Sequence, residues 1–404
     1  MINAVNILTS SGKFRVNLGL NRIKAILELL DNPQKKLKFI HIAGTNGKGS
    51  TSKIINDILI EHFKSKKNIG LYTSPHLFSY CERIKINNSD ISEKDFTFLL
   101  ESINNLANKN NIDLTEFELL TAVALKYFEI NEVEYVVFEV GLGGRFDATN
   151  IIENSEVSVI TTIDFDHTQR LGSTIDEIAY QKAGIIKDHS KVVISKNNLG
   201  YEIIKKVANG KNARIVTPND VEIDFIGFSE NYALFDNKKY KFNLLGKHQK
   251  DNLALALAVI DCLDLNIKKE TVENALKKIQ WKFRLEYDNE KNLLIDGAHN
   301  PNGIRALKNF IDENLKNQKK TIIFGCLNNK DYSKMLEILL EGENSFYFFE
   351  FDYPNSLKYD ELPEKFKKKA KLLKSVDEVK DIINNNKTLK IICGSLYMLG
   401  KVFK

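Results

Sequence analysis

The chain has 404 residues, of which 43% are hydrophobic and 27% are charged, and this is the composition of a folded globular protein. Its length exceeds that of one ordinary core, since domains average about 150 residues, so we expect two or three folded units. The 58 basic and 53 acidic residues are spread along the whole chain, which argues against a nucleic-acid-binding face and favours small-molecule chemistry.

The cysteines and the N-terminus indicate the compartment. The cysteines are far apart and form no CxxC pair, which argues against a zinc site or disulfides. The N-terminal stretch MINAVNILTSSGKFRVN lacks the basic start and apolar core of a secretion signal, and no apolar run reaches the ~20 residues that span a bilayer. We therefore expect a cytoplasmic protein with no membrane partner and, for lack of an oligomerisation signal, a monomer.

Short apolar runs recur along the first half of the chain, and most of them are followed by a helical pattern. Each run ends in a polar or glycine-rich turn, and the runs cover residues 38–44, 68–74, 135–141, 157–165 and 191–195. Such alternation predicts a parallel sheet with helices on its faces. In sheets of this kind, ligands bind at the C-terminal ends of the strands.

The pattern changes after residue 220 and then returns. Residues 221–245 alternate polar and apolar around Asp236-Asn237, which predicts a small antiparallel excursion with a hairpin turn. A helix is expected at 248–263. Apolar runs then restart, at 293–300, 321–327, 345–351 and 389–395. We therefore place a domain boundary between residues 285 and 292. The lysine-rich segment 365–374 is interpreted as a solvated helix face.

A glycine-rich stretch, AGTNGKGST at 43–51, follows the first predicted strand and precedes a helix. It departs from the common phosphate loop, because Ile42 stands where the first glycine is expected and Gly49 where the hydroxyl is expected. Its context is still that of an anion site, since a glycine turn exposes the N–H groups of the helix N-terminus. Lys48 would neutralise phosphate charge, and Ser50 would cap the helix or contact a phosphate. The alternative is a glycine turn that binds nothing.

A second group of polar residues follows the predicted strand 135–141. Glu139 closes that strand, where a carboxylate commonly holds a magnesium ion or its water. In the next loop, GLGGRFDATN, Arg145 can clamp a carboxylate or phosphate and Asp147 can accept from a substrate N–H. The alternative is that Glu139 forms a salt bridge and the loop is only a turn.

Further candidates lie at the ends of later elements. His167 follows the strand after Glu139, and both should lie at the C-terminal edge of one sheet. A capping box, Thr174 to Glu177, predicts the start of a helix that carries Lys182. From its chemistry alone, Lys182 is interpreted as a surface or ion-paired lysine.

In the second half, two motifs hold polar residues that suit a nucleotide. Asn252, in LLGKHQKDN, can read an adenine edge, although an ordinary polar helix start explains it equally well. Asp296 and His299, in DGAHNPNG, follow the first strand of the later domain, again where ligands collect.

Taken together, these motifs resemble the folylpolyglutamate synthase and dihydrofolate synthase family of the Mur ligase superfamily. The matching stretches run in the family's order along nearly the whole chain: AGTNGKGST (43–51), TSPHL (73–77), ERIKIN (82–87), EVGLGGRFDATN (139–150), DHT (166–168), LGSTIDEIAYQKAGII (171–186), LLGKHQKDN (244–252), DGAHNPNG (296–303) and CGSLYM (393–398). Gly49 is the extra glycine of the folate branch. Only about 40 residues precede the loop, so we expect no uridine-nucleotide-binding domain and hence a folate substrate.

The resemblance implies a fold and a reaction. The fold is α/β, with an N-terminal P-loop Mur-ligase-type ATP-binding domain (1–287) that has a mostly parallel sheet and a small antiparallel excursion. A C-terminal Rossmann-like glutamate-ligase domain (288–404) follows. ATP would phosphorylate the carboxylate of dihydropteroate or of the terminal glutamate of a folate, and the amine of L-glutamate would then attack the acyl phosphate. ADP and phosphate would leave, as in dihydrofolate and tetrahydrofolate synthases.

The resemblance also implies roles for individual residues. The triphosphate-binding loop comprises Gly44, Thr45, Asn46, Gly47, Lys48, Gly49 and Ser50. The magnesium ligands, for two ions, are Ser74, Glu139 and His167, and a monovalent cation such as K⁺ is a further expectation. Lys182 matches a lysine that the family carries as a carbamate. Asn252, Arg284, Asp296 and His299 match nucleotide-binding positions, and Phe117 and Asp147 match pterin-binding positions.

One departure and two alternatives remain. Asn329-Lys330-Asp331 stands where the family often has an Asp-Lys-Asp triplet, so a glutamate-binding or domain-closing role there is less secure. A Mur-type ligase for another acid would differ in the acceptor that supports ADP release. A GTPase-like switch would require an Asn/Thr-Lys-x-Asp motif, and Asn329-Lys330-Asp331 lacks the spacer.

Overall fold

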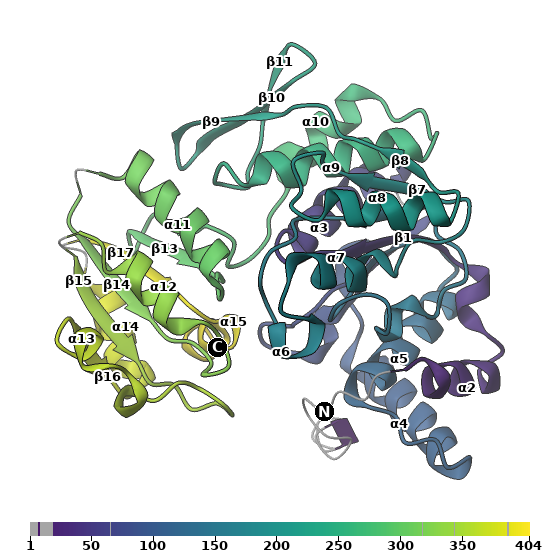
Figure 1. Ribbon diagram of the computed structural model, residues 1–404, viewed down its shortest axis with the longest axis horizontal. Coiled ribbons are helices and arrows are strands. Elements are labelled where there is room, and N and C mark those ends of the chain that lie inside the picture. The colour runs from purple at the N-terminus through teal and green to yellow at the C-terminus, as the bar shows by residue number, and fades with distance from the viewer. Residues whose placement is uncertain (1–6, 9–18, 65, 317, 343, 386–387) are drawn as a thin grey trace. The chain divides into compact units, whose positions relative to one another are not determined.

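A computed structural model describes the chain except for residues 1–6, 9–18, 65, 317, 343 and 386–387 (Figure 1). The chain forms two compact units. The first comprises Met1–Asp220 with Asp251–Leu276, and the second comprises Val221–Lys250 with Lys277–Lys404. None of the described helices is long and apolar enough to cross a membrane.

The first unit is built on an eight-stranded sheet, counted within the described residues, with the order β4-β3-β2-β5-β1-β6-β7-β8. The strands are β1 (Lys38–Ala43), β2 (Asn68–Tyr72), β3 (Ile84–Ile86), β4 (Ser89–Asp90), β5 (Val133–Glu139), β6 (Val157–Ile160), β7 (Lys191–Ile194) and β8 (Arg214–Val216). The strands from β2 to β8 in this order pair in parallel, whereas β3 and β4 are added as antiparallel edge strands. The predicted parallel sheet is therefore confirmed.

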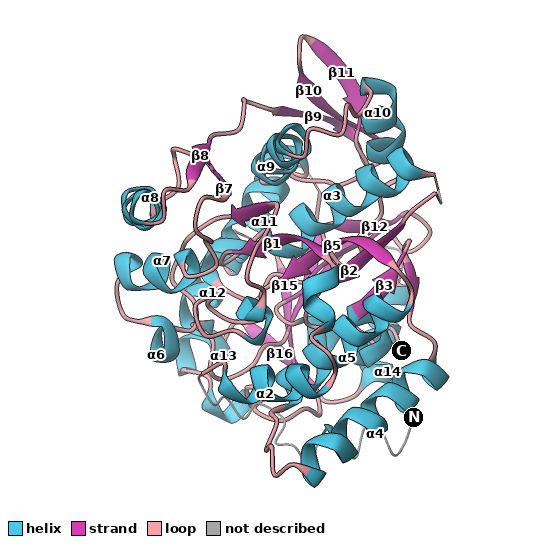
Figure 2. Cartoon of the chain, turned by 90° about the vertical axis from the view of Figure 1, so that its right-hand side faces the viewer, coloured by secondary structure: helices cyan, strands magenta, loops and turns pink. Residues whose placement is uncertain are grey.

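Helices cover both faces of this sheet. They are α2 (Asn21–Leu29), α3 (Lys48–Phe63), α4 (Glu93–Lys109), α5 (Glu116–Ile130), α6 (Thr168–Leu171), α7 (Ile175–Ala183), α8 (Tyr201–Gly210), α9 (Gln249–Cys262) and α10 (Lys269–Lys278). Short 3-10 turns lie in the connections before β1, between β2 and β3, and between β5 and β6: η1 (Pro33–Lys36), η2 (Tyr80–Arg83) and η3 (Ala148–Ile151). Helices α2, α4 and α5 pack together over one hydrophobic cluster (Figure 2), and α7 and α8 pack over another. Thr174 and Glu177 form the capping box that the sequence predicts at the start of α7.

The second unit contains the antiparallel excursion. Its three strands, β9 (Glu222–Gly227), β10 (Glu230–Phe235) and β11 (Lys238–Lys241), pair in sequence order. Asp236 and Asn237 form the turn between β10 and β11, with φ angles of 50° and 57°. Positive φ at both central residues matches the right-handed twist of a hairpin, which is why this Asp-Asn pair marked the turn.

A six-stranded sheet forms the rest of the second unit, again counted within the described residues, with the order β12-β13-β17-β14-β15-β16. The strands are β12 (Glu286–Asp288), β13 (Leu293–Asp296), β14 (Lys320–Phe324), β15 (Ser345–Phe349), β16 (Ala370–Leu373) and β17 (Leu389–Cys393). All neighbours are parallel except β12 and β13. The other elements are α11 (Pro301–Asn314), α12 (Tyr332–Leu339), η4 (Tyr359–Glu361), α13 (Glu364–Lys367), α14 (Val376–Asn384) and α15 (Leu396–Val402).

The interpretation of segment 365–374 as a solvated helix face was wrong. Helix α13 ends at Lys367, and residues 370–373 form the edge strand β16. Phe366, Ala370 and Leu373 are buried, and Ala370 belongs to the core of this unit. The apolar residues therefore decided the local structure, and the lysines between them only occupy its exposed positions.

Candidate functional site

The glycine loop between β1 and α3 requires glycine at two positions. Gly44 has φ +156°, and a Cβ added there would lie 1.7 Å from Thr161 Oγ1. Gly47 has φ +86°, and its Cβ would lie 2.2 Å from Asn252 Oδ1. Because α3 begins at Lys48 with no side-chain cap, the loop leads directly to a helix N-terminus, where free N–H groups favour an anion.

The residues after β6 hold this loop in place. The Thr45 N–H donates to the Thr162 carbonyl at 2.7 Å, and Thr161 Oγ1 donates to the Asn46 carbonyl at 2.7 Å. Thr45 Oγ1 also donates to the Asp164 carbonyl at 3.0 Å. The run 157–165 predicted as one strand is therefore divided, because β6 ends at Ile160 and the rest anchors the loop. Thr161 and Thr162 are site residues that the sequence did not reveal, since nothing in two threonines announces a backbone anchor.

Two lysine side chains converge on the carbonyl oxygen of Gly44. Lys48 Nζ donates to it at 3.1 Å, and Lys182 Nζ donates to it at 2.8 Å. Lys182 is only 4% exposed, so its interpretation as a surface lysine was wrong. Burial, together with the nearby Lys48 charge, lowers the pKa of Lys182 to about 7. A substantial share of the Lys182 amine is therefore uncharged near neutral pH.

Oxygen and nitrogen donors suited to a metal ion lie near the ends of β2, β5 and β6. Glu139 is buried at the end of β5, and its Oε2 accepts the Ser74 N–H at 3.3 Å. His167, with φ 51°, is the N-cap residue of α6, and its Nε2 lies 3.8 Å from Asp166 Oδ1. Among the described residues no group of three or more His, Cys, Asp and Glu is placed to hold a metal. A metal here would need further ligands, such as phosphate oxygens and water.

The loop after β5 is closed by Asp147. Its Oδ2 accepts the Leu142 N–H at 2.8 Å, and its Oδ1 accepts the Thr149 N–H at 3.0 Å and the Thr149 hydroxyl at 2.6 Å. Burial raises the pKa of the Asp147 carboxyl, against these hydrogen bonds. Asp147 therefore fixes the shape of its own loop.

A buried histidine continues this hydrogen-bond chain. His41 Nε2 lies 2.9 Å from Thr149 Oγ1, and its Nδ1 has no hydrogen-bond partner. The Thr149 hydroxyl has one proton, which goes to Asp147, so it accepts from His41 and the imidazole carries its proton on Nε2. Complete burial lowers the pKa of His41 well below its usual value, so the ring stays neutral.

The same loop packs against the end of α7. The Arg145 N–H donates to the Gln181 carbonyl at 2.8 Å, and a Cβ on Gly144 would lie 2.9 Å from the Lys182 carbonyl oxygen. An Arg145 guanidinium nitrogen donates to the Tyr180 hydroxyl at 2.7 Å. On the other side, Phe117 lies so close to Gly141 that a Cβ there would be 2.5 Å from the ring. Phe117 and the Asp147 loop are therefore neighbours.

The remaining candidates belong to α9 and to the second unit. Asn252 is buried on α9, where its Oδ1 accepts from Thr51 Oγ1 at 3.4 Å, so it lies against the phosphate loop. In the second unit, Asp296 accepts the N–H groups of Leu285 and Ala298, each at 2.8 Å. Burial raises the pKa of Asp296 and the Arg284 charge opposes this, so Arg284 lies nearby. His299 Nδ1 lies 2.9 Å from the Gly297 carbonyl oxygen.

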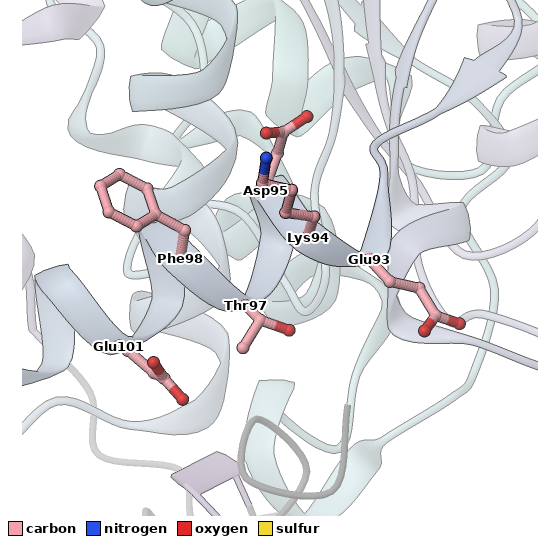
Figure 3. Close-up of a pocket in the computed structure, with 6 residues that line it drawn as sticks. All are labelled: Glu93, Lys94, Asp95, Thr97, Phe98 and Glu101. Atoms are coloured by element: carbon pink, nitrogen blue, oxygen red, sulfur yellow. The ribbon is translucent and has the colours of Figure 1, made fainter.

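Two further features are separate from the candidate site residues described so far. A surface hollow of ≈690 Å³ follows the first turns of α4 (Figure 3), and it is lined by Glu93, Lys94, Asp95, Thr97, Phe98 and Glu101. None of the candidate residues lines it. In the unusual Asn329-Lys330-Asp331 triplet, Asp331 is the N-cap of α12 and accepts the Lys334 N–H.

The fold and this loop define a nucleotide-dependent enzyme, because a glycine turn, a helix N-terminus and two lysines meet at the C-terminal edge of a parallel sheet. The Mur ligase middle domain family matches residues 42–260, and the dihydrofolate synthetase C-terminal domain family matches residues 279–404. A dihydrofolate synthase/folylpolyglutamate synthase of Bacillus subtilis is 33% identical, over 97% of this chain and 96% of the relative.

Solved structures agree with the sequence matches. A bifunctional folylpolyglutamate synthase/dihydrofolate synthase of Yersinia pestis, complexed with AMPPNP and a Mn ion, has a TM-score of 0.86 at 28% identity, covering 100% of this chain and 97% of that one. E. coli FolC in complex with DHPP and ADP has a TM-score of 0.85 at 25% identity, covering 99% of this chain and 96% of that one. The chain belongs to the dihydrofolate synthase/folylpolyglutamate synthase family of the Mur ligases. It is an ATP-dependent ligase that adds L-glutamate to dihydropteroate, to folates, or to both.

Proposed function

We propose that the first unit binds the triphosphate of ATP and the carboxylate acceptor beside each other and directs phosphoryl transfer between them. The γ-phosphoryl group moves from the ADP oxygen to a carboxylate oxygen of the acceptor. The α-amine of L-glutamate then attacks the acyl carbon, the amide bond forms, phosphate leaves and the amine loses a proton. The observation that carries this proposal is the convergence of Lys48 and Lys182 on the Gly44 carbonyl oxygen at a helix N-terminus.

The loop supplies the phosphate contacts in this proposal. The backbone N–H groups at the start of α3, from Lys48 to Ser50, would bind the phosphates, and Lys48 adds a charge at the β- and γ-phosphates. The N–H groups of Thr45 and Asn46 instead donate to Thr162 and hold the loop in place. Lys48 is held by carbonyl oxygens of the loop itself, at 3.1 Å from Gly44 and 3.3 Å from Thr45, so it is already positioned at the turn. Asn252, on α9, accepts a hydrogen bond from Thr51 of α3 and would recognise the nucleotide.

Two Mg²⁺ ions are part of the proposal, with Ser74, Glu139 and His167 as protein ligands. The contact between Glu139 and the Ser74 backbone supports this set, because it brings a carboxylate and a hydroxyl residue together at the sheet edge. These are hard donors of the kind that Mg²⁺ prefers, and the relative from Yersinia pestis is complexed with Mn. Bound there, the ions would neutralise negative charge on the phosphates. A monovalent cation such as K⁺ stays in the proposal without assigned ligands.

Lys182 is proposed to carry a carbamate. Its uncharged amine can attack the carbon of CO₂, so that a C–N bond forms, one proton leaves the nitrogen and a carboxylate remains. The low pKa that burial and Lys48 give to Lys182 supports this assignment, because a protonated amine has no lone pair for the attack. The product would place a negative charge beside Lys48 and provide an oxygen ligand for a cation.

The acceptor is proposed to bind at Phe117 and the loop of Arg145 and Asp147. Phe117 offers an aromatic face against Gly141, and Asp147 holds the loop closed. In the second unit, Arg284, Asp296 and His299 keep the nucleotide-binding role that the family resemblance implies. We retain as proposals the domain boundary after residue 287, the monomeric state and the cytoplasmic location.

A phosphate-release assay with ATP, L-glutamate and one acceptor at a time tests this function. We expect release that requires both glutamate and the acceptor. Dihydropteroate alone as acceptor would define a single-step dihydrofolate synthase, a reduced folate alone a polyglutamate synthase, and both a bifunctional enzyme. Phosphate release that needs neither glutamate nor a pterin would contradict the proposal.

A further inference from the structure

Arg83 occupies an unusual place in the first unit. It ends the turn η2, just before β3, and only 7% of it is exposed. Its carbonyl oxygen accepts the N–H of Thr73 at 3.1 Å. Thr73 immediately precedes Ser74, so Arg83 lies at the same sheet edge as the proposed magnesium ligands. No part of the function proposed above uses this side chain.

The charge of Arg83 is not neutralised within the described part of the chain. Its Nε donates to His76 Nδ1 at 2.9 Å, and its guanidinium carbon lies 5.4 Å from the centre of the Tyr80 ring. Among the described residues, no Asp or Glu forms an ion pair with it. His76 Nδ1 accepts this hydrogen bond, so it gives the guanidinium a partner but no negative charge. A buried guanidinium without an anion carries a desolvation penalty that a ligand can remove.

The nearest carboxylate in sequence is committed elsewhere. Glu82 accepts the N–H groups of Leu77, Phe78 and Ser79, at distances of 2.8 to 2.9 Å. These bonds cap η2 and orient the Glu82 carboxylate toward the preceding loop. The Glu82 carboxylate is therefore occupied by backbone N–H groups and does not neutralise the charge of Arg83.

Arg83 lies beside the proposed acceptor site. Burial raises the pKa of Tyr72 and the Arg83 charge opposes that shift, so the two side chains are close enough to interact. The Tyr72 ring lies 5.9 Å from that of Phe117, the aromatic residue of the proposed acceptor site. Tyr80, over which Arg83 lies, donates to Glu116 Oε1 at 3.1 Å, next to Phe117 at the start of α5. The unneutralised cation and the acceptor site therefore share a neighbourhood.

We propose that Arg83 binds the carboxylate of the pteroate-type acceptor, with His76 fixing the orientation of the guanidinium. This assignment rests on the proposed acceptor site. An acceptor carboxylate must approach the γ-phosphate of ATP, and two anions repel each other unless cations lie between or beside them. A planar guanidinium with its Nε already bonded still presents donors that match a carboxylate.

A comparison of two ligands tests the assignment. Binding of dihydropteroate and of its carboxamide, which has no charge, is measured by calorimetric titration to wild-type protein and to Arg83→Leu and Arg83→Lys. Wild type should prefer the carboxylate by about tenfold to a hundredfold, the range of a charge-assisted hydrogen bond. Arg83→Leu should bind the two ligands within about twofold of each other, and Arg83→Lys should keep part of the preference.

Arg22→Leu is the matched control. Arg22 also contacts α5, but its guanidinium forms an ion pair with Glu118 at 3.1 Å, so this variant should keep the wild-type preference. The unfolding midpoint of ligand-free Arg83→Leu should equal or exceed that of wild type, because the variant removes an unpaired buried charge. A lower midpoint would contradict that argument.

Three outcomes would separate the hypotheses. If Arg83→Leu retains the wild-type preference for the carboxylate, Arg83 does not bind it. If both ligands weaken equally, the role of Arg83 is structural and the assignment is wrong. If wild-type protein ligates glutamate to neither dihydropteroate nor a folate, the proposed function itself fails, and this assignment fails with it.

Discussion

Lys182 Nζ donates a hydrogen bond to the Gly44 carbonyl oxygen at 2.8 Å, which connects helix α7 to the phosphate loop across 138 positions of sequence. The backbone carbonyl of the same Lys182 faces Gly144 of the loop that carries Arg145 and Asp147. One residue therefore contacts both the loop proposed to bind ATP and the loop proposed to bind the acceptor. Changes at Lys182 should affect both.

Lys182→Ala should cripple ligation, because it removes the carbamate and the bond to Gly44. Adding a short-chain carboxylate such as acetate or propionate should restore part of the turnover, since it can supply the missing anionic oxygens. Removal of CO₂ and bicarbonate from wild-type enzyme should lower its activity in the same way. Turnover of the variant at the wild-type rate would show that Lys182 has no metal-related role.

The pKa of Lys182 also predicts a pH dependence of stability. With a pKa of about 7 in the fold and an ordinary value of 10.5, the unmodified Lys182 amine, in protein freed of CO₂ and bicarbonate, is protonated mainly in the unfolded chain between these limits. Stability rises with pH wherever the unfolded state binds more protons. The free-energy cost of burying the charged Lys182 amine is therefore full below pH 7. The stability of the fold then rises as the pH increases from about 7 towards 10.5. Urea unfolding at several pH values should show this rise in wild type, and Lys182→Met should flatten it. An equal slope in both proteins would mean that Lys182 does not titrate as described.

Lys48→Ala should reduce kcat/KM for ATP by about a hundredfold or more, because one charge that neutralises the transferring phosphoryl group is lost. The side chain donates hydrogen bonds to the Gly44 and Thr45 carbonyl oxygens of the loop, so the fold of the variant has to be checked. Circular dichroism and the unfolding midpoint check that the variant folds. Near-normal turnover would remove Lys48 from the phosphate site.

The sequence predicted the parallel sheets, the hairpin at Asp236-Asn237 and the position of the phosphate loop, because strand periodicity and turn chemistry are local signals. It did not predict β16, because the many lysines of that segment outweigh its short apolar pattern. It also did not predict that Thr161 and Thr162 hold the phosphate loop in place. The burial of Lys182 was also hidden. A lysine on an amphipathic helix looks exposed in sequence, and only the packing of α7 against the loop after β5 brings it inside. These features all depend on contacts between distant segments.

Gly47→Ala should impair ATP binding more than it impairs folding. Alanine at φ +86° is strained by about 1 kcal/mol, and its Cβ would meet Asn252 Oδ1 at 2.2 Å, so the loop must shift. Gly210→Ala is the control, since a Cβ there meets nothing within 4 Å at the end of α8. Titration with a non-hydrolysable ATP analogue should show weaker binding only for the first variant. Equal affinity for both would mean that the loop has room for a side chain.

His41 should act on the acceptor site through Thr149 and Asp147. Its Nε2–H donates to the Thr149 hydroxyl oxygen, and that hydroxyl in turn donates to Asp147 at 2.6 Å. In His41→Leu the buried Thr149 hydroxyl has no donor, and this should lower the free energy of unfolding by about 1 to 3 kcal/mol. The same change should make the position of the Asp147 carboxylate less fixed. The KM for the acceptor should rise while the KM for ATP changes little, because the chain leads to the loop after β5.

Conservative variants separate this role from simple packing. His41→Gln places an amide N–H at about the position of Nε2 and should recover most of the acceptor KM. Thr149→Ser, which keeps the hydroxyl, should resemble wild type, whereas Thr149→Val, which loses it, should resemble His41→Leu. The double variant His41→Leu/Thr149→Val should be less impaired than the sum of the single changes, since both remove the same chain. If His41→Gln is as impaired as His41→Leu, or if the two effects simply add, the hydrogen-bond chain does not control Asp147.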